Sequence, residues 1–215
     1  MLCYKNGALA REKIRDFHAG GDWMTFNQLV ESTPPGNNGY MALYYPLPEI
    51  IPANVTGEFL FSCRDPGIPV CVDSIPLIAG PRAILESQLL SVLSRIKDVL
   101  PDGSPHLRRL VVSGGSSINE TILQTVADIF GTPVFVASGP ASTEAACIGG
   151  AMLALHAWNR QRGKKASTPS DALHRVIQPR DGRSERYRDL LDAYRACEAE
   201  AVRLYEVSRV VDRCP

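Results

Sequence analysis

Two adjacent glycines, Gly114 and Gly115, limit what the middle of this chain can fold into. The apolar run at 107–112 before them predicts a buried strand, and the apolar residues after them recur at helical spacing. Ser117 and Glu120 have the spacing of a capping box, which predicts the start of that helix. Because glycine has no Cβ, a turn of this kind allows a ligand to lie close to the backbone.

The helix after these glycines would direct free N–H groups and the positive end of its dipole at the same space, which suits a phosphate or a polar ribose. We place Asn119 at the second helical position, from which its amide would reach a ligand above Gly114 and Gly115. On spacing alone, the segment also fits a tight turn before an ordinary capped helix. The chain has no Gly-x-x-x-x-Gly-Lys-Ser/Thr, no Gly-x-Gly-x-x-Gly after a strand and no Gly-x-Ser-x-Gly.

The order of helical and strand patterns predicts an α/β fold. Helices are expected at about 23–30, 81–99, 118–130, 142–160 and 184–209, and strands at 107–112 and 133–137. Ser142 or Thr143 would begin the fourth helix, whose small residues would let another backbone approach closely. Cys147 and Cys197 fall in helical patterns and are expected in the core.

Composition excludes several classes of function. The chain has 23 Lys+Arg and 23 Asp+Glu, so it lacks the basic excess of a nucleic-acid binder or a polybasic membrane surface. Its longest nearly apolar stretch, 145–155, is shorter than the ~20 residues that span a bilayer, and no secretory signal is evident at its start. The six cysteines form no Cys-x-x-Cys pair, so we expect no metal site and a cytosolic location.

Three motifs follow one another in the middle of the chain: the Gly-Gly pair with Asn119 at 110–119, an Ala-Asp-x-x-Gly-x-Pro-Val run at 127–134 and a small-residue helix at 144–151. Together they resemble the FGGY carbohydrate kinases. Within the family, the chain is similar to the xylulose kinases of eukaryotes over most of residues 1–158, and most clearly at 1–12, 39–49 and 82–88.

This resemblance implies the actin/hexokinase-like (ribonuclease H-like) C-terminal domain of a sugar kinase, with ATP and Mg²⁺ as cofactors. The nucleotide-binding domain would occupy 1–160, followed by a polar connector at 161–183 and a helix at 184–215 that packs on the same domain.

The resemblance also implies the nucleotide contacts. Gly114 and Gly115 would lie beside the adenosine and the α-phosphate, and Asn119 would contact the nucleotide. Trp23 corresponds to a position near the adenine, although its spacing from Phe26 also fits a core aromatic on a helix face.

The implied activity is that of a D-xylulose kinase, which converts ATP and D-xylulose to ADP and D-xylulose 5-phosphate. In the family, the catalytic base, the sugar pocket and a phosphate motif precede the segment with which this chain begins. We therefore assign no catalytic residue here and expect the chain alone to be inactive. The alternatives are a non-catalytic nucleotide-binding or interaction module, or a ribulose or glycerol kinase. A face that normally packs on the first domain would be exposed and would favour self-association.

Overall fold

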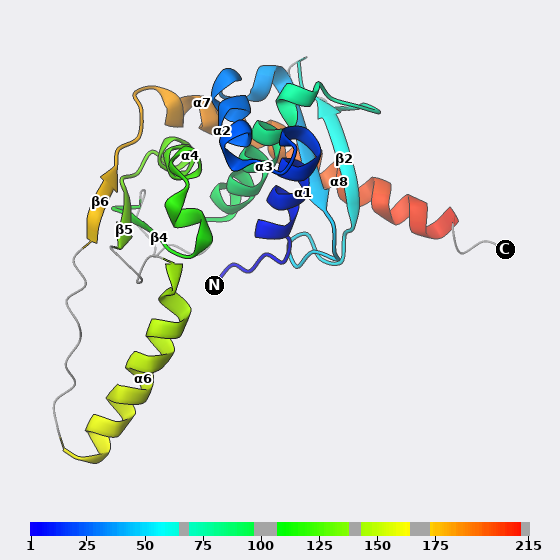
Figure 1. Ribbon diagram of the computed structural model, residues 1–215. Coiled ribbons are helices and arrows are strands. Elements are labelled where there is room, and N and C mark those ends of the chain that lie inside the picture. The colour runs from blue at the N-terminus through cyan, green and yellow to red at the C-terminus, as the bar shows by residue number, and fades with distance from the viewer. Residues whose placement is uncertain (65–68, 97–106, 138–142, 164–172, 212–215) are drawn as a thin grey trace. The chain divides into compact units, whose positions relative to one another are not determined.

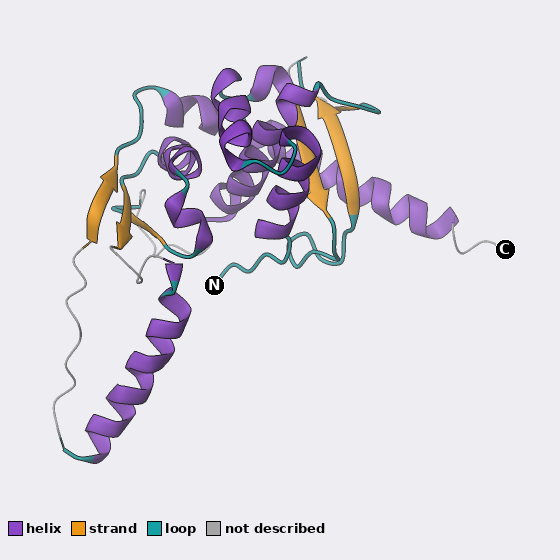
Figure 2. Cartoon of the chain, in the orientation of Figure 1, coloured by secondary structure: helices purple, strands orange, loops and turns teal. Residues whose placement is uncertain are grey.

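The computed structural model describes residues 1–64, 69–96, 107–137, 143–163 and 173–211 (Figure 1). The chain divides into two units, which are described separately below. Unit 1 comprises Met1–Pro105 and Asp181–Pro215, and unit 2 comprises His106–Arg180. Each unit contains helices and a small sheet (Figure 2). No helix of the described residues is both long enough and apolar enough to cross a membrane.

Unit 1 is built on an antiparallel sheet of order β1-β2-β3. Its strands are β1 (Tyr40–Tyr45), β2 (Gly57–Ser62) and β3 (Val70–Cys71), and its α-helices are α1 (Gly7–Ala19), α2 (Trp23–Ser32), α3 (Gly80–Arg95), α7 (Arg183–Asp189) and α8 (Leu191–Val211). Helices α3 and α8 both contact β1, and residues 41–45 of that strand are all buried. Burial on both faces explains why β1 is apolar without alternation.

Helix α3 is the central helix of unit 1, because α1, α2, α8 and β1 all pack against it. Pro81 lies in its first turn, as the sequence predicts, and ten of its residues from Gly80 to Ser91 are buried on all sides of the helix. The last residues of the predicted helix, 97–99, lie outside the described residues. Two of the buried residues are charged, Arg82 and Glu86, and they need partners in the interior.

The Arg82 guanidinium binds the C-terminal end of α2. Its Nε donates to the Val30 carbonyl at 3.1 Å and to the Thr33 hydroxyl at 2.9 Å, and its Nη2 donates to the Val30 carbonyl at 2.7 Å. The Val30 carbonyl lies in the last turn of α2 and also accepts from the Thr33 N–H at 3.3 Å, so these bonds reinforce the C-terminal end of that helix. The remaining nitrogen, Nη1, lies 3.1 Å from the Glu86 carboxylate.

The Glu86 carboxylate joins two further segments to α3, the 34–39 turn and α7. Its Oε1 accepts hydrogen bonds from the Gly36 N–H at 3.1 Å, from the Tyr187 hydroxyl at 2.9 Å and from Arg82 at 3.1 Å. Burial raises the pKa of Glu86, and the charge of Arg82 and these hydrogen bonds oppose that rise. The buried pair therefore ties α2, the 34–39 turn, α3 and α7 together.

A second buried carboxylate, Glu49, holds the N-terminal end of α1. Its two oxygens accept from the backbone N–H of Lys5 at 2.6 Å, of Asn6 at 3.1 Å and of Ile50 at 2.7 Å, and from the Asn6 amide at 2.9 Å. Burial opposes the ionisation of Glu49, but these hydrogen bonds outweigh it, so the pKa of Glu49 lies below its ordinary value.

Unit 2 contains a three-stranded sheet of order β4-β5-β6. Strands β4 (Leu110–Val112) and β5 (Val134–Ala137) are parallel and are connected through helix α4 (Glu120–Phe130), as the sequence predicts, although β4 begins three residues later than expected. Gly131 ends α4 in the left-handed conformation, with φ 58°. Strand β6 (Leu173–Ile177) pairs antiparallel with β5.

Strand β6 lies inside the range 161–183, for which the sequence indicates a polar connector. It is an edge strand of a small sheet, and Val176 remains 43% exposed. A short strand that gains little burial leaves only a weak apolar pattern in the sequence, which is why it is missed.

Two helix predictions are corrected by the structure. Helix α6 (Ala145–Gln161) has Glu144 at its N-cap position without a side-chain cap bond, so Thr143 is not the cap, and Ser142 lies outside the described residues. None of its residues is buried, and Cys147 is exposed rather than in the core. The predicted helix at 184–209 is divided into α7 and α8 at Leu190.

The C-terminal helices, α7 and α8, have buried residues at helical spacing. Tyr187, Tyr194, Cys197 and Ala201 are buried, whereas Val207 is 50% exposed. Cys197 packs against the end of β2, where its Sγ lies 3.3 Å from the Sγ of Cys63. Cys197 is therefore a core residue, as expected.

We predict that Arg82→Met lowers the free energy of unfolding of unit 1 by about 3 kcal/mol, because it leaves the buried Glu86 carboxylate without its cation. Urea denaturation followed by Trp23 fluorescence, in a Trp158→Phe background, measures the change in unit 1. The matched control is Arg203→Met, which removes an exposed ion pair with Glu200 and should change little. Equal losses in the two variants would contradict a structural role for the buried pair.

We also predict that the stability contributed by Glu49 depends on pH. Because its folded pKa is depressed, the contribution is fully present above the ordinary glutamate value of about 4.3 and is lost as the pH falls through the folded pKa. The difference in unfolding free energy between wild type and Glu49→Gln should therefore shrink between about pH 6 and about pH 3. Glu206→Gln, on the exposed side of α8, is the control, and a difference that stays constant over this range would refute the prediction.

Candidate functional site

The glycine turn, residues 113–119, connects β4 to α4 in unit 2. Gly114 has φ 82° and ψ −168°, a backbone conformation that residues with a Cβ rarely adopt. Its carbonyl accepts hydrogen bonds from the Ser117 N–H at 2.9 Å and from the Ser117 hydroxyl at 2.7 Å. These bonds close a short 3₁₀ turn at Gly115–Ile118 before the helix begins.

The helix cap is Asn119 rather than Ser117. The Asn119 backbone is extended, and its Oδ1 accepts a hydrogen bond from the Ile122 N–H at 3.0 Å. The predicted capping box of Ser117 and Glu120 is thus wrong, because the Ser117 hydroxyl is bonded within the preceding turn. Asn119 is also not at the second helical position, and any contact that it makes with a ligand must be compatible with its role as a cap.

The space beside the two glycines is open. A Cβ built on Gly114 or on Gly115 meets no atom of the described residues within 4 Å. Gly115 does not have a positive φ, so its backbone alone does not require glycine. Because neither glycine has a side chain, a ligand has room to lie against the backbone here, which fits the approach of a nucleotide.

Ile118 belongs to this turn, although the sequence predicts it in the helix at 118–130. Its position in the apolar pattern assigned it to the buried face of the helix, but it lies in the 3₁₀ turn and is 68% exposed. An exposed isoleucine next to the open glycines adds apolar surface to the candidate site. The 3₁₀ turn that places it there is closed by the bonds between Ser117 and Gly114, which the apolar pattern cannot reveal.

The far end of α4 is held by a buried carboxylate. Asp128, from the Ala-Asp-x-x-Gly-x-Pro-Val run, is 1% exposed and accepts from the Arg180 N–H at 2.9 Å, from Arg180 Nε at 2.8 Å and from Gln124 Nε2 at 2.9 Å. These bonds join α4 to the segment after β6. In this structure the aspartate of the motif supports the helix that follows the glycine turn.

Trp23 lies in unit 1, where it is the first residue of α2. Its ring packs edge-on against Phe26 at a centroid distance of 5.2 Å, and the Arg15 guanidinium lies 4.9 Å from its centroid. Trp23 is half-buried, so its packing on the helix face agrees with the second interpretation of its spacing. Gly114, Gly115 and Asn119 lie together in one turn of unit 2, and the adenine contact of Trp23 remains a prediction.

Comparisons with known proteins support the identity of this domain. Residues 73–158 match the C-terminal domain of the FGGY family of carbohydrate kinases. A xylulose kinase of Mus musculus is 34% identical over 205 residues, which cover 92% of this chain and 35% of the relative. Xylulose kinase 2 of Arabidopsis thaliana is 35% identical over 170 residues, which cover 74% of this chain and 29% of that relative. The chain spans about a third of the length of these curated relatives.

Solved structures show the same fold. The xylulose kinase from Rhodospirillum rubrum gives a TM-score of 0.66 at 20% identity, over 95% of this chain and 40% of that one. The ligand-bound xylulose kinase from Lactobacillus acidophilus gives a TM-score of 0.68 at 17% identity, over 94% of this chain and 40% of that one. These neighbours confirm the expected α/β fold of the actin/hexokinase-like type. The chain therefore belongs to the FGGY family of carbohydrate kinases, of which it carries the C-terminal domain.

Proposed function

We propose that this chain is the ATP-binding part of a D-xylulose kinase, which transfers the γ-phosphoryl group of ATP to D-xylulose and releases ADP and D-xylulose 5-phosphate. The observation that carries the proposal is the open turn at Gly114 and Gly115, which lies within the residues that match the FGGY domain. The sugar is proposed from the relatives, whose names identify them as xylulose kinases.

In this proposal the chain contributes binding and orientation. Phosphoryl transfer depends mainly on positioning the phosphates and stabilising their charge. The backbone at Gly114 and Gly115 would lie against the adenosine and the α-phosphate, and the N-terminal end of α4 would face the same space with its positive dipole. Asn119 would contact the nucleotide while it caps α4, and Trp23 would contribute an aromatic surface near the adenine.

The metal ion is expected to accompany the nucleotide. When bound with the nucleotide, Mg²⁺ would supply neutralisation of the charge on the phosphates. Within the described parts of the chain, no group of three or more His, Cys, Asp or Glu side chains is placed to hold a metal. We therefore assign no protein ligand to Mg²⁺ here. A cytosolic location and self-association through an exposed apolar face stay predictions.

We predict that Gly115→Ala weakens ATP binding at least about tenfold without destabilising the fold. The added methyl group enters space that is open in this structure, so it collides with a bound nucleotide and not with the protein. Isothermal titration of the full chain with Mg·ATP measures the affinity. Gly7→Ala is the matched control, because its Cβ also meets nothing within 4 Å but lies in unit 1. Equal affinity in wild type and Gly115→Ala would contradict a nucleotide at this turn.

Asn119 is tested in the same titration by two variants with different effects. Asn119→Ser keeps an oxygen that can cap α4 but removes the amide, whereas Asn119→Ala removes both. We expect both variants to weaken ATP binding and only Asn119→Ala to lower the stability of α4, by about 1 kcal/mol. Unchanged ATP affinity in Asn119→Ser would limit Asn119 to its role as a helix cap.

We predict that the 215-residue chain binds ATP but does not phosphorylate D-xylulose. In the family that the chain resembles, the catalytic base and the sugar pocket are expected in the other domain, and the chain spans about a third of the length of its curated relatives. A coupled assay for ADP, run beside the ATP titration, measures both properties on one sample. ATP-dependent formation of D-xylulose 5-phosphate well above the enzyme-free rate would overturn this prediction, whereas ATP binding without turnover also fits a non-catalytic nucleotide-binding module.

A further inference from the structure

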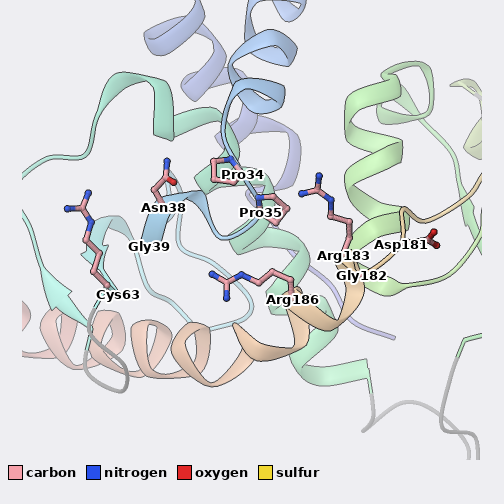
Figure 3. Close-up of a pocket in the computed structure, with 10 residues that line it drawn as sticks. Pro34, Pro35, Asn38, Gly39, Cys63, Asp181, Gly182, Arg183 and Arg186 are labelled. Atoms are coloured by element: carbon pink, nitrogen blue, oxygen red, sulfur yellow. The ribbon is translucent and has the colours of Figure 1, made fainter.

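Unit 1 has a surface cavity of about 640 Å³ that the proposed kinase function does not use. Three segments that are distant in sequence form its walls: the 34–39 turn, residues 63–64 after β2, and residues 181–186 at the start of α7 (Figure 3). All three belong to unit 1, whereas the glycine turn belongs to unit 2. We call this hollow the arginine cavity, because Arg64, Arg183 and Arg186 line it.

Two of the arginines come from one short helix. Arg183 and Arg186 are three residues apart on α7, a spacing that places them on neighbouring positions of the helix surface. Figure 3 shows both side chains extending from α7 at the cavity with Pro34 and Pro35 opposite. Gly36 has φ +80°, and a Cβ on it would lie 3.6 Å from Nη2 of Arg186. The guanidinium of Arg186 therefore lies next to the 34–39 turn.

The third arginine is held in place by a neutral partner. Arg64 Nη2 donates to the Tyr40 hydroxyl at 2.7 Å, and its guanidinium carbon lies 4.7 Å from the centre of the Tyr40 ring. Stacking on an aromatic ring orients a guanidinium without cancelling its charge. Arg64 therefore reaches the cavity wall as an oriented cation.

The positive charges of the cavity are not neutralised by ion pairs in the part of the chain that the structure describes. There, no carboxylate oxygen lies within 4.0 Å of a nitrogen of Arg64, Arg183 or Arg186, whereas other arginines, such as Arg195 and Arg203, form such pairs. Asp181 also lines the cavity, but its carboxylate points away from Arg183 and Arg186 in Figure 3. Three cations around one hollow repel one another and attract an anion.

We propose that the arginine cavity binds the phosphate group of a small molecule. The planar guanidinium fork matches phosphate oxygens in a bidentate manner, and arginine is the side chain best suited to this recognition. Asn38, at the cavity wall, adds an amide that can donate to the same group. The volume falls in the range of small-molecule sites, about 300–1,000 Å³. The ligand is either free phosphate or a phosphate ester of a sugar, which share this group.

The test is a calorimetric titration of the full chain at constant ionic strength with two probes, inorganic phosphate and a pentose 5-phosphate. We expect Arg183→Gln/Arg186→Gln to raise the dissociation constant at least about tenfold for the probe that binds. The matched control is Arg195→Gln/Arg203→Gln, which removes the same charge from exposed, ion-paired sites on α8 and should leave the constant unchanged. Arg183→Lys/Arg186→Lys keeps the charge but loses the fork, and should bind with intermediate affinity.

The outcomes separate the sources and the sites. An ester that binds at least about tenfold more tightly than phosphate identifies the ester as the ligand, and equal affinities identify the phosphate group as sufficient. Gly115→Ala should still bind the probe, so failure of the nucleotide site does not affect this test. The proposal is overturned if neither anion binds the wild-type chain, or if the cavity variant and the control variant bind equally. The thermal unfolding of each variant, followed by Trp23 fluorescence in a Trp158→Phe background, verifies that unit 1 is folded.

Discussion

Removing the Arg82 guanidinium and the Glu86 carboxylate from water costs several kcal/mol for each ion, and only dense hydrogen bonding in the interior offsets that cost. Unit 1 meets this requirement by bringing the end of α2, the 34–39 turn and α7 to one point on α3. Much of its architecture follows from that condition. The 34–39 turn and α7 are also two walls of the arginine cavity, so the buried pair fixes the segments that present Arg183 and Arg186 to solvent.

Unit 2 reaches rigidity by a different route. Its helix α4 is fixed at the start by the Asn119 cap and near its end by the bonds between Asp128 and Arg180. A helix held at both ends keeps its first N–H groups in a constant place relative to the glycine turn, which is what a preorganised anion or nucleotide site requires. The open space at Gly114 and Gly115 therefore lies beside a helix that is held at both ends.

The sequence predicted the elements that carry strong local signals. Pro81 and Gly131 mark a helix start and a helix end, and the parallel strands on either side of α4 follow from their apolar runs. The cap of α4 was predicted wrongly, because the Ser117 hydroxyl bonds within the 3₁₀ turn and Asn119 caps the helix instead. The two glycines of the candidate site could be proposed from the sequence because a glycine turn between a strand and a helix is a local pattern. The arginine cavity could not be predicted from the sequence, because residues 64 and 183–186 come together only in the tertiary structure.

The division of unit 1 into two stretches, with unit 2 between them, has a consequence for how the chain is made. Helix α8 covers β1, and Tyr187 donates to Glu86, but both are synthesised after the whole of unit 2. A nascent chain that ends before residue 181 therefore exposes apolar surface of β1 and lacks one donor to a buried carboxylate. The entropy of closing such a long loop grows only slowly with its length, so the insertion itself is tolerated. The N-terminal stretch of unit 1 can therefore complete its packing only after residues 181–211 have been synthesised.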